Sequence, residues 1–145
     1  MATTKYEVTT IASMLTTEMN SLGAGSLCAL GTEYANQTNL YIEGLFELYV
    51  TFGTAPVLGT TVDLYLVSCP DATNYADGSS SVVSESNFVG SFVLRDVNTA
   101  QRITLREHVK IPPLKFKVHV KNNTAQAMAS SGNTVKMVPI RYQSA

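Results

Sequence analysis

An alternation of apolar and polar side chains, which returns in six segments, most constrains what this chain can fold into. It is clearest over residues 114–121, where apolar positions alternate with Lys115, Lys117, His119 and Lys121. Successive side chains of a β-strand point to opposite faces, so this period of two predicts strands with one buried face. We expect such strands at residues 39–52, 61–67, 87–95, 102–106, 114–121 and 133–142.

Strands with one apolar face need a second layer to bury it. Six or more short strands therefore predict an all-β fold, an antiparallel β-sandwich or jelly roll. Residues 39–52 and 61–67 have matching patterns and a loop rich in Gly and Pro between them, so we expect them to pair. Leu40 and Ile42 fall on the expected inward row, and Gly44 interrupts that row, which is typical of a bend or a close backbone approach.

The N-terminal segment breaks the period of two. Between residues 10 and 22 the apolar residues recur at helical spacing: Ile11, Met14, Leu15, Met19 and Leu22. This spacing predicts an amphipathic helix that ends at Gly23. The predicted organisation is an arm and helix over residues 1–23, followed by a β-sandwich domain over residues 24–145. The helix either reaches a neighbouring protein or covers one end of its own sandwich.

The charge content limits the classes of partner. The net charge is −1 and only 14% of the residues are charged, against a usual value of about 25%. A chain so poor in basic residues is not expected to bind nucleic acid. No apolar run approaches the roughly 20 residues that span a bilayer, and we expect no secretory signal. A surface of neutral hydroxyl groups opposes association only weakly, which is typical of a protein that belongs to a dense assembly.

No constellation of catalytic or metal-binding residues stands out. His108 and His119 are the only histidines, and we expect His119 on the outward side of its strand, either facing solvent or packing against a neighbouring strand. Cys28 and Cys69 have no metal-binding spacing and are predicted to be free thiols. We therefore predict no catalytic residue, no cofactor, no metal and no enzymatic activity.

Two glutamates, Glu43 and Glu47, lie four residues apart on one predicted strand. The rise of a strand separates them by roughly 13 Å, more than the carboxylate pairs of glycosidases need. We expect them to pair with the lysines of residues 115–121.

The segment 68–86 is predicted to be a long exposed loop. Asp71, Asn74 and Asp77 precede Gly78 there, which suits either a calcium site or simple Asx turns, and we favour the turns. Asn36 and Asn122 begin glycosylation sequons that should stay bare without a secretory signal.

Five tyrosines offer an alternative, a sugar-stacking platform on one side of the sandwich: Tyr34, Tyr41, Tyr49, Tyr65 and Tyr75. Tyrosines also serve ordinary packing and subunit contacts, where the ring packs and the hydroxyl stays hydrated. We favour the packing or contact role.

Over nearly its full length the sequence resembles a family of small structural proteins encoded in the head-gene region of tailed bacteriophages. The motifs that carry the resemblance are at residues 17–22, 38–50, 62–67, 71–78, 92–95, 112–118 and 131–142. They encode strands and turns, with no chemistry of their own.

This resemblance implies a virion protein, made in the host cytoplasm, that acts as a cement or decoration protein on the outside of the capsid. The implied partner is the major capsid protein, and the implied state is a homo-oligomer, with a trimer favoured. The alternative is a carbohydrate-binding jelly-roll module that serves host attachment.

Overall fold

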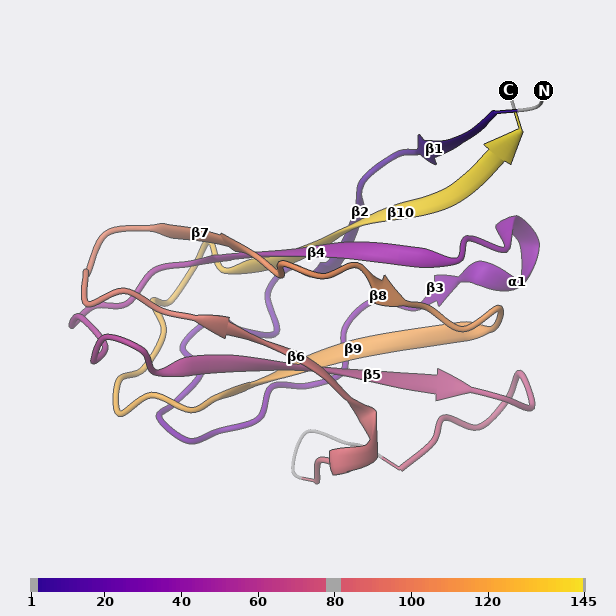
Figure 1. Ribbon diagram of the computed structural model, residues 1–145. Helices are drawn as coiled ribbons and strands as arrows, with labels where there is room; N and C mark the ends of the chain where they lie inside the picture. The colour runs from indigo at the N-terminus through magenta and orange to yellow at the C-terminus, as the bar shows by residue number, and fades with distance from the viewer. Residues whose placement is uncertain (1–2, 78–81, 145) are drawn as a thin grey trace.

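Two stacked layers of β-strands form the body of the molecule (Figure 1). The computed structural model describes residues 3–77 and 82–144. A six-stranded sheet contains β1 (Thr4–Val8), β2 (Ala12–Leu15), β4 (Glu43–Val50), β7 (Gln101–Thr104), β8 (Val109–Lys110) and β10 (Thr134–Ser144). A four-stranded sheet contains β3 (Tyr34–Ala35), β5 (Thr61–Cys69), β6 (Phe88–Val93) and β9 (Lys115–Asn122). One turn of helix, α1 (Asn36–Asn39), and a 3-10 turn, η1 (Glu85–Asn87), complete the described elements.

The core lies between the two sheets and is built by the alternation seen in the sequence. In β4, Phe46, Leu48 and Val50 are fully buried, while the residues between them are half-buried. In β9, Phe116, Val118 and Val120 face them from the other sheet. All described strand pairs are antiparallel. The predicted antiparallel β-sandwich is therefore confirmed.

The expected pairing of residues 39–52 with residues 61–67 is wrong. β4 lies between β10 and β7 in the six-stranded sheet, whereas β5 lies between β9 and β6 in the other sheet. The connection over residues 51–60 thus crosses from one layer to the other. Both strands have one buried face in either arrangement, so their pattern alone does not decide between a hairpin and a crossover.

The predicted helix over residues 10–22 is also wrong. Residues 12–15 form β2, which pairs with β10, and turns follow as far as Ser21, whose φ is 57°. Met14, Leu15 and Met19 are buried as predicted, but a short strand and a turn bury them. Four threonines flank these residues, and β-branched side chains favour extended backbone over helix.

The arm and the predicted sandwich domain share one sheet. β1 and β2, which lie in the predicted arm and helix segment, both pair with β10 of the predicted sandwich domain. The backbone carbonyls of Leu22 and Gly23 also accept hydrogen bonds from the Asn122 side chain at 3.2 and 3.1 Å.

The inward row predicted before β4 is only partly correct. Leu40 and Ile42 are 56% and 45% exposed, because α1 and the left-handed Leu40 turn the chain before the strand begins at Glu43. Gly44 does mark a close approach. A Cβ there would lie 2.8 Å from the Met137 Sδ atom, so the glycine makes room for that side chain.

Of the two settings expected for His119, exposure to solvent is wrong and packing against a neighbouring strand is confirmed. Its side chain is fully buried on the outer face of the four-stranded sheet, with its ring edge-on to Tyr65 at 5.8 Å between centroids. Part of the predicted exposed loop folds over this face. Ala76 N–H donates to Ser68 C=O at 2.8 Å, and the Lys117 ammonium lies over the Tyr75 ring. Residues 78–81 of that loop lie outside the described residues.

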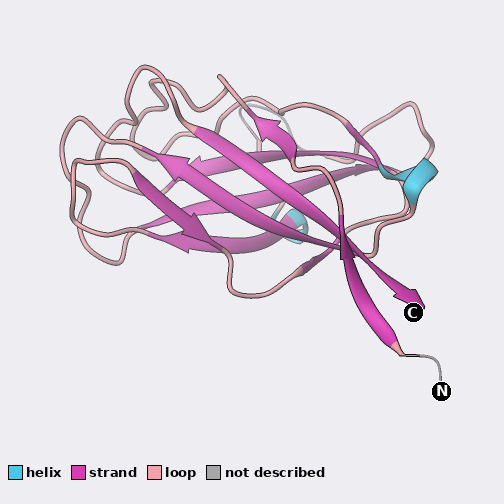
Figure 2. Ribbon diagram, turned by 90° about the horizontal axis from the view of Figure 1, so that it is seen from above, coloured by secondary structure: helices cyan, strands magenta, loops and turns pink. Residues whose placement is uncertain are grey.

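The end of β10 and the paired β1 extend beyond the sandwich as a two-stranded ribbon (Figures 1 and 2). Tyr6, Val8 and Tyr142 are exposed along it. None of the described helices is long and apolar enough to cross a bilayer.

Candidate functional site

A groove runs along the side of the sandwich where the edge strands of the two sheets face each other. β6 is the last strand of the four-stranded sheet, and β7 and β8 lie along the corresponding edge of the other sheet. The groove has a volume of about 470 Å³. A second hollow of about 390 Å³, also lined by Val89 and Lys110, continues it toward η1.

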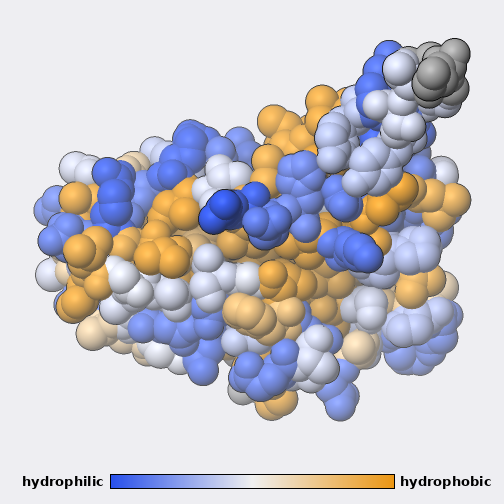
Figure 3. Space-filling view, viewed as in Figure 1, coloured by the Kyte–Doolittle hydropathy of each residue, from blue (hydrophilic) through white to orange (hydrophobic). Residues whose placement is uncertain are grey.

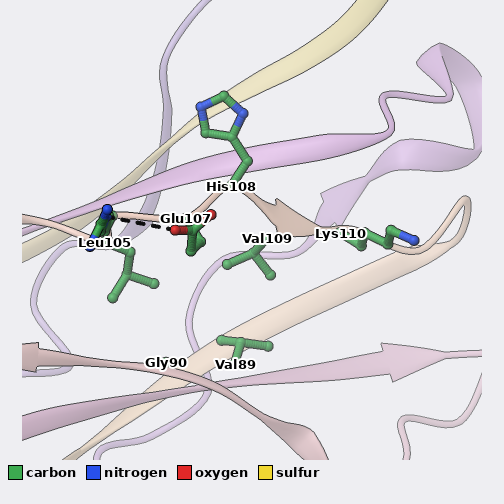
Figure 4. A pocket seen from close by; sticks show the side chains of 8 residues that line it. Val89, Gly90, Leu105, Glu107, His108, Val109 and Lys110 are labelled. Atoms are coloured by element: carbon green, nitrogen blue, oxygen red, sulfur yellow. Dashed lines mark ion pairs between the residues drawn. The ribbon is translucent and has the colours of Figure 1, made fainter.

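Apolar side chains line the inside of this groove and charged ones its border. Val89, Leu105 and Val109 point into it (Figure 4). Arg106 and Glu107 are among the residues at its border, and their side chains are 93% and 88% exposed. Hydrophobic residues reach the surface along this side of the molecule (Figure 3). The groove is therefore suited to hold an apolar segment of a partner.

The side chains that could serve as a general acid or base do not point into the groove together. The His108 ring points away from Val89 and Val109 (Figure 4). Its Nδ1 lies 3.1 Å from Glu43 Oε2, on the outer face of the six-stranded sheet. Tyr142 donates a hydrogen bond to Glu43 Oε1 at 3.4 Å, and the Tyr6 ring is edge-on to His108. This exposed cluster joins the base of the ribbon to the sheet.

The expected pairing of Glu43 and Glu47 with the lysines of residues 115–121 is wrong. Those lysines belong to the other sheet, and Glu47 instead pairs with Arg102 at 2.5 Å. Arg102 also lies over the Tyr49 ring, 4.9 Å from its centroid. Both contacts join the adjacent strands β4 and β7, a pairing that the sequence pattern did not predict.

Both cysteines are free and buried. Burial raises the pKa of the Cys28 thiol to about 11, because the thiolate would lose its hydration. No group of three His, Cys, Asp or Glu side chains with metal-binding geometry occurs within residues 3–77 and 82–144.

The five tyrosines do not form one platform. Tyr41 and Tyr65 are buried, at 8% and 3% exposure. Tyr49 lies on the six-stranded sheet, whereas Tyr34 packs on Phe116 of the other sheet at 5.4 Å between ring centroids. Near it, the Tyr75 hydroxyl donates to the Glu33 carboxylate, and burial together with Glu33 raises the pKa of Tyr75. The geometry therefore does not support the sugar-stacking platform, which was the alternative to a packing or contact role.

The sequon asparagines are structural. Asn36 is fully buried, and its amide nitrogen donates to the carbonyls of Tyr41 and Pro112, both at 2.8 Å. Asn122 is likewise fully buried. In the folded chain neither side chain is accessible to a glycan.

The Asx turn predicted at Asp71 is confirmed. Its carboxylate accepts hydrogen bonds from the Asn74 N–H at 2.6 Å, the Asn74 side chain at 2.8 Å and the Thr73 N–H at 2.9 Å. Gly78, the last residue of the motif, lies outside the described residues.

These bonds, the Asn74 N–H first among them, lower the pKa of Asp71 to about 2, from an ordinary value of 3.8. Because the folded pKa is the lower one, the turn gains its full stabilisation above about pH 4 and loses it as the pH falls toward 2. We expect a carboxyl NMR titration to place the Asp71 midpoint near pH 2. A midpoint near 3.8 would contradict the turn.

Sequence reasoning missed the groove and the exposed edge of β1. The groove is made by residues of β6 and of the β7–β8 segment, which only the folded sheets bring together. A signal for β1 was present, because Lys5, Tyr6, Glu7 and Val8 alternate in polarity.

No family model matches the chain. No curated protein matches it either. Among solved structures, one described as "Structural basis for the promiscuous specificity of the carbohydrate-binding modules from the beta-sandwich super family" is similar, with 12% identity and a TM-score of 0.35. The similarity covers 98% of this chain and 56% of that chain, so this chain spans about half of its length. A likeness this weak carries no argument about function, and the fold assignment rests on the strand pairing.

Proposed function

We propose that this chain is a structural protein of a phage virion, a cement or decoration protein that binds the outside of the capsid and stabilises the junctions between major capsid subunits. The observation that carries the proposal is the groove between the sheet edges, with Val89, Leu105 and Val109 inside and charged residues at its border. An apolar groove without convergent ionisable groups is suited to contact rather than to chemistry.

The sequence resemblance and the low charge content also support this role. Sandwich edges leave strand backbone available, and β6 pairs with β5 on one side only within the described chain. A partner segment can extend such an edge by backbone hydrogen bonds while its side chains fill the adjacent groove. Many weak contacts of this kind, repeated over a capsid, add up to stable attachment.

The experiment mixes the full-length protein with capsids assembled from the major capsid protein alone. We expect co-sedimentation with the capsids and a higher capsid melting temperature. The variant Val109→Lys places a charge in the groove and should weaken capsid binding at least about tenfold, because an unpaired charge is costly to bury. The matched control is Val57→Lys, since Val57 is 68% exposed and does not line the groove.

Failure of the wild-type protein to bind these capsids would overturn the proposal. Equal binding by Val109→Lys and Val57→Lys would exclude the groove as the contact. Saturable binding of soluble sugars, lost in Tyr49→Ala, would favour the carbohydrate-binding alternative instead. Cryo-electron microscopy of the decorated particle would then give the position and copy number of the protein.

A further inference from the structure

Strand β1 has one unpaired edge. It pairs with β10 along one side, from Thr4 opposite Ser144 to Val8 opposite Ile140, and no described strand lies on its other side. Tyr6 and Val8 are 61% and 64% exposed. The ribbon also stands clear of the sandwich body (Figure 2), so a second chain can approach this edge without a clash. An isolated two-stranded ribbon is marginally stable, and a further strand would support it.

The hydrogen bonding of the sheet shows which backbone groups of β1 face this edge. Leu105 N–H donates to Phe46 C=O at 3.0 Å, so the even-numbered residues of β4 direct their backbone groups toward β7. The direction alternates along each antiparallel strand. In the β4–β10 register the even-numbered residues of β10 face β4, so its odd-numbered residues face β1. In the β10–β1 register Lys5 and Glu7 therefore face β10, and the backbone groups of Thr4, Tyr6 and Val8 face the open edge.

We propose that two copies of this chain pair antiparallel through β1, about a two-fold axis that passes at Tyr6. In this register Tyr6 lies opposite the partner's Tyr6, and Thr4 lies opposite the partner's Val8. Every N–H and C=O group that these three residues present at the edge then has a partner. The two sheets become one sheet that continues across the axis.

The charges of β1 are self-complementary in this register alone. Lys5 lies opposite the partner's Glu7, and Glu7 lies opposite the partner's Lys5. A shift of two residues places Lys5 against the partner's Lys5, or Glu7 against the partner's Glu7. Parallel pairing in register also sets like charges side by side. Opposite charges directly across an antiparallel pair stabilise it, and like charges destabilise it.

The ribbon already holds the participating side chains in place. Glu7 pairs with Arg141 at 2.5 Å, so its carboxylate is fixed on the face where the partner's Lys5 would lie. On the other face Tyr6 packs on Tyr142, with 5.1 Å between ring centroids. Across the axis the two tyrosine pairs form one continuous row. The trimer favoured from the sequence has no such support at this edge, because a two-fold contact joins copies in pairs.

Charged residues on an edge strand can instead serve to prevent association. Cross-linking separates the two roles. Directly opposed residues of a hydrogen-bonded pair have Cα atoms about 5.5 Å apart, within the range of a disulfide. Under mild oxidation Tyr6→Cys should form a covalent dimer. Thr4→Cys alone should not, because its counterpart lies about 13 Å further along the strand. An equal mixture of Thr4→Cys and Val8→Cys should cross-link.

Charge reversal gives an independent test in solution. Lys5→Glu leaves the Glu7–Arg141 pair intact but places two like-charge pairs across the axis. We therefore expect the dissociation constant of the dimer, measured by sedimentation velocity, to rise about 30-fold. The control Lys136→Glu, an exposed lysine outside β1, should leave dimerisation unchanged. A mixture of Lys5→Glu and Glu7→Lys should form mixed dimers.

Cross-linking of Thr4→Cys alone but not of Tyr6→Cys, a monomer at all concentrations, or an oligomer insensitive to Lys5→Glu would overturn the inference. The inference goes beyond the proposed function, and none of these experiments contains a capsid. Its failure is therefore distinguishable from a failure of capsid binding.

Discussion

Replacement of Gly31 by alanine is expected to lower the free energy of unfolding by about 3 kcal/mol. A Cβ atom at this position would lie 2.1 Å from the Met14 carbonyl oxygen and 2.5 Å from the Leu15 Cδ2 atom. Backbone cannot move aside here, because Gly31 N–H donates to Val118 C=O at 2.9 Å and Thr32 N–H donates to Met14 C=O at 3.0 Å. The segment is held between β9 and β2. Denaturant unfolding of the purified variant measures the loss.

Two other glycines provide graded controls for Gly31→Ala. At Gly53 a Cβ meets nothing within 4 Å, so Gly53→Ala should change stability by less than about 0.5 kcal/mol. At Gly44 the obstacle is the flexible Met137 side chain, which can change rotamer, so an intermediate loss is expected. A Gly31→Ala protein as stable as Gly53→Ala would show that the Met14–Gly31 approach is wrong.

The second large effect is expected at Asn122, where alanine should cost about 3 kcal/mol. The buried amide nitrogen donates to the carbonyls of Leu22, Gly23 and Gln126, at 3.2, 3.1 and 2.8 Å. The amide oxygen accepts from the Thr124 N–H and hydroxyl, at 3.1 and 2.8 Å. Alanine would leave these groups without that partner, and a buried polar group without a hydrogen bond is destabilising.

The neighbouring Asn123 is the matched control. Its amide donates to the Asp63 carboxylate at 2.6 Å in an exposed site, where water can replace it. Asn123→Ala should therefore cost less than about 1 kcal/mol. Thermal unfolding of both variants at one pH gives the comparison. Equal losses at the two positions would contradict the assignment of Asn122 as the link between residues 22–23 and the end of β9.

Much of the strand content could be predicted from the sequence, because alternation is a local property. The pattern over residues 114–121 corresponds to β9 at Lys115–Asn122, and that over residues 133–142 corresponds to β10 at Thr134–Ser144. Sheet membership is not local. β4 and β5 are consecutive long strands with the same pattern, yet they lie in different layers, and no residue between them marks the crossover.

The wrong burial assignments at His119 and Ile42 have different local causes. His119 follows the outward row of β9, and Ile42 follows the inward row before β4. The first is buried against Tyr65 of the neighbouring strand, and the second is turned outward where the strand has not yet begun. An alternating sequence pattern predicts which face of the strand a side chain occupies. It does not predict what covers that face.

The helix predicted over residues 10–22 failed for a different reason. Met14, Leu15 and Met19 satisfy the helical spacing and also satisfy a strand followed by a turn. So few apolar residues do not distinguish a helix from a strand followed by a turn. In the structure this segment forms a strand because it pairs with β10. The groove was beyond sequence reasoning, because its opposite walls come from β6 and from residues 105–110.

The place of β10 in the six-stranded sheet governs when the protein can fold during synthesis. This strand is the last of the described strands along the chain, yet it lies between β4 on one side and β1 and β2 on the other. A nascent chain on the ribosome therefore carries β1, β2 and β4 without their shared neighbour until residues 134–144 have been translated. Non-local pairing of this kind slows folding. Until residues 134–144 emerge, the strands that pair with β10 expose unpaired edges, and such edges favour misassembly.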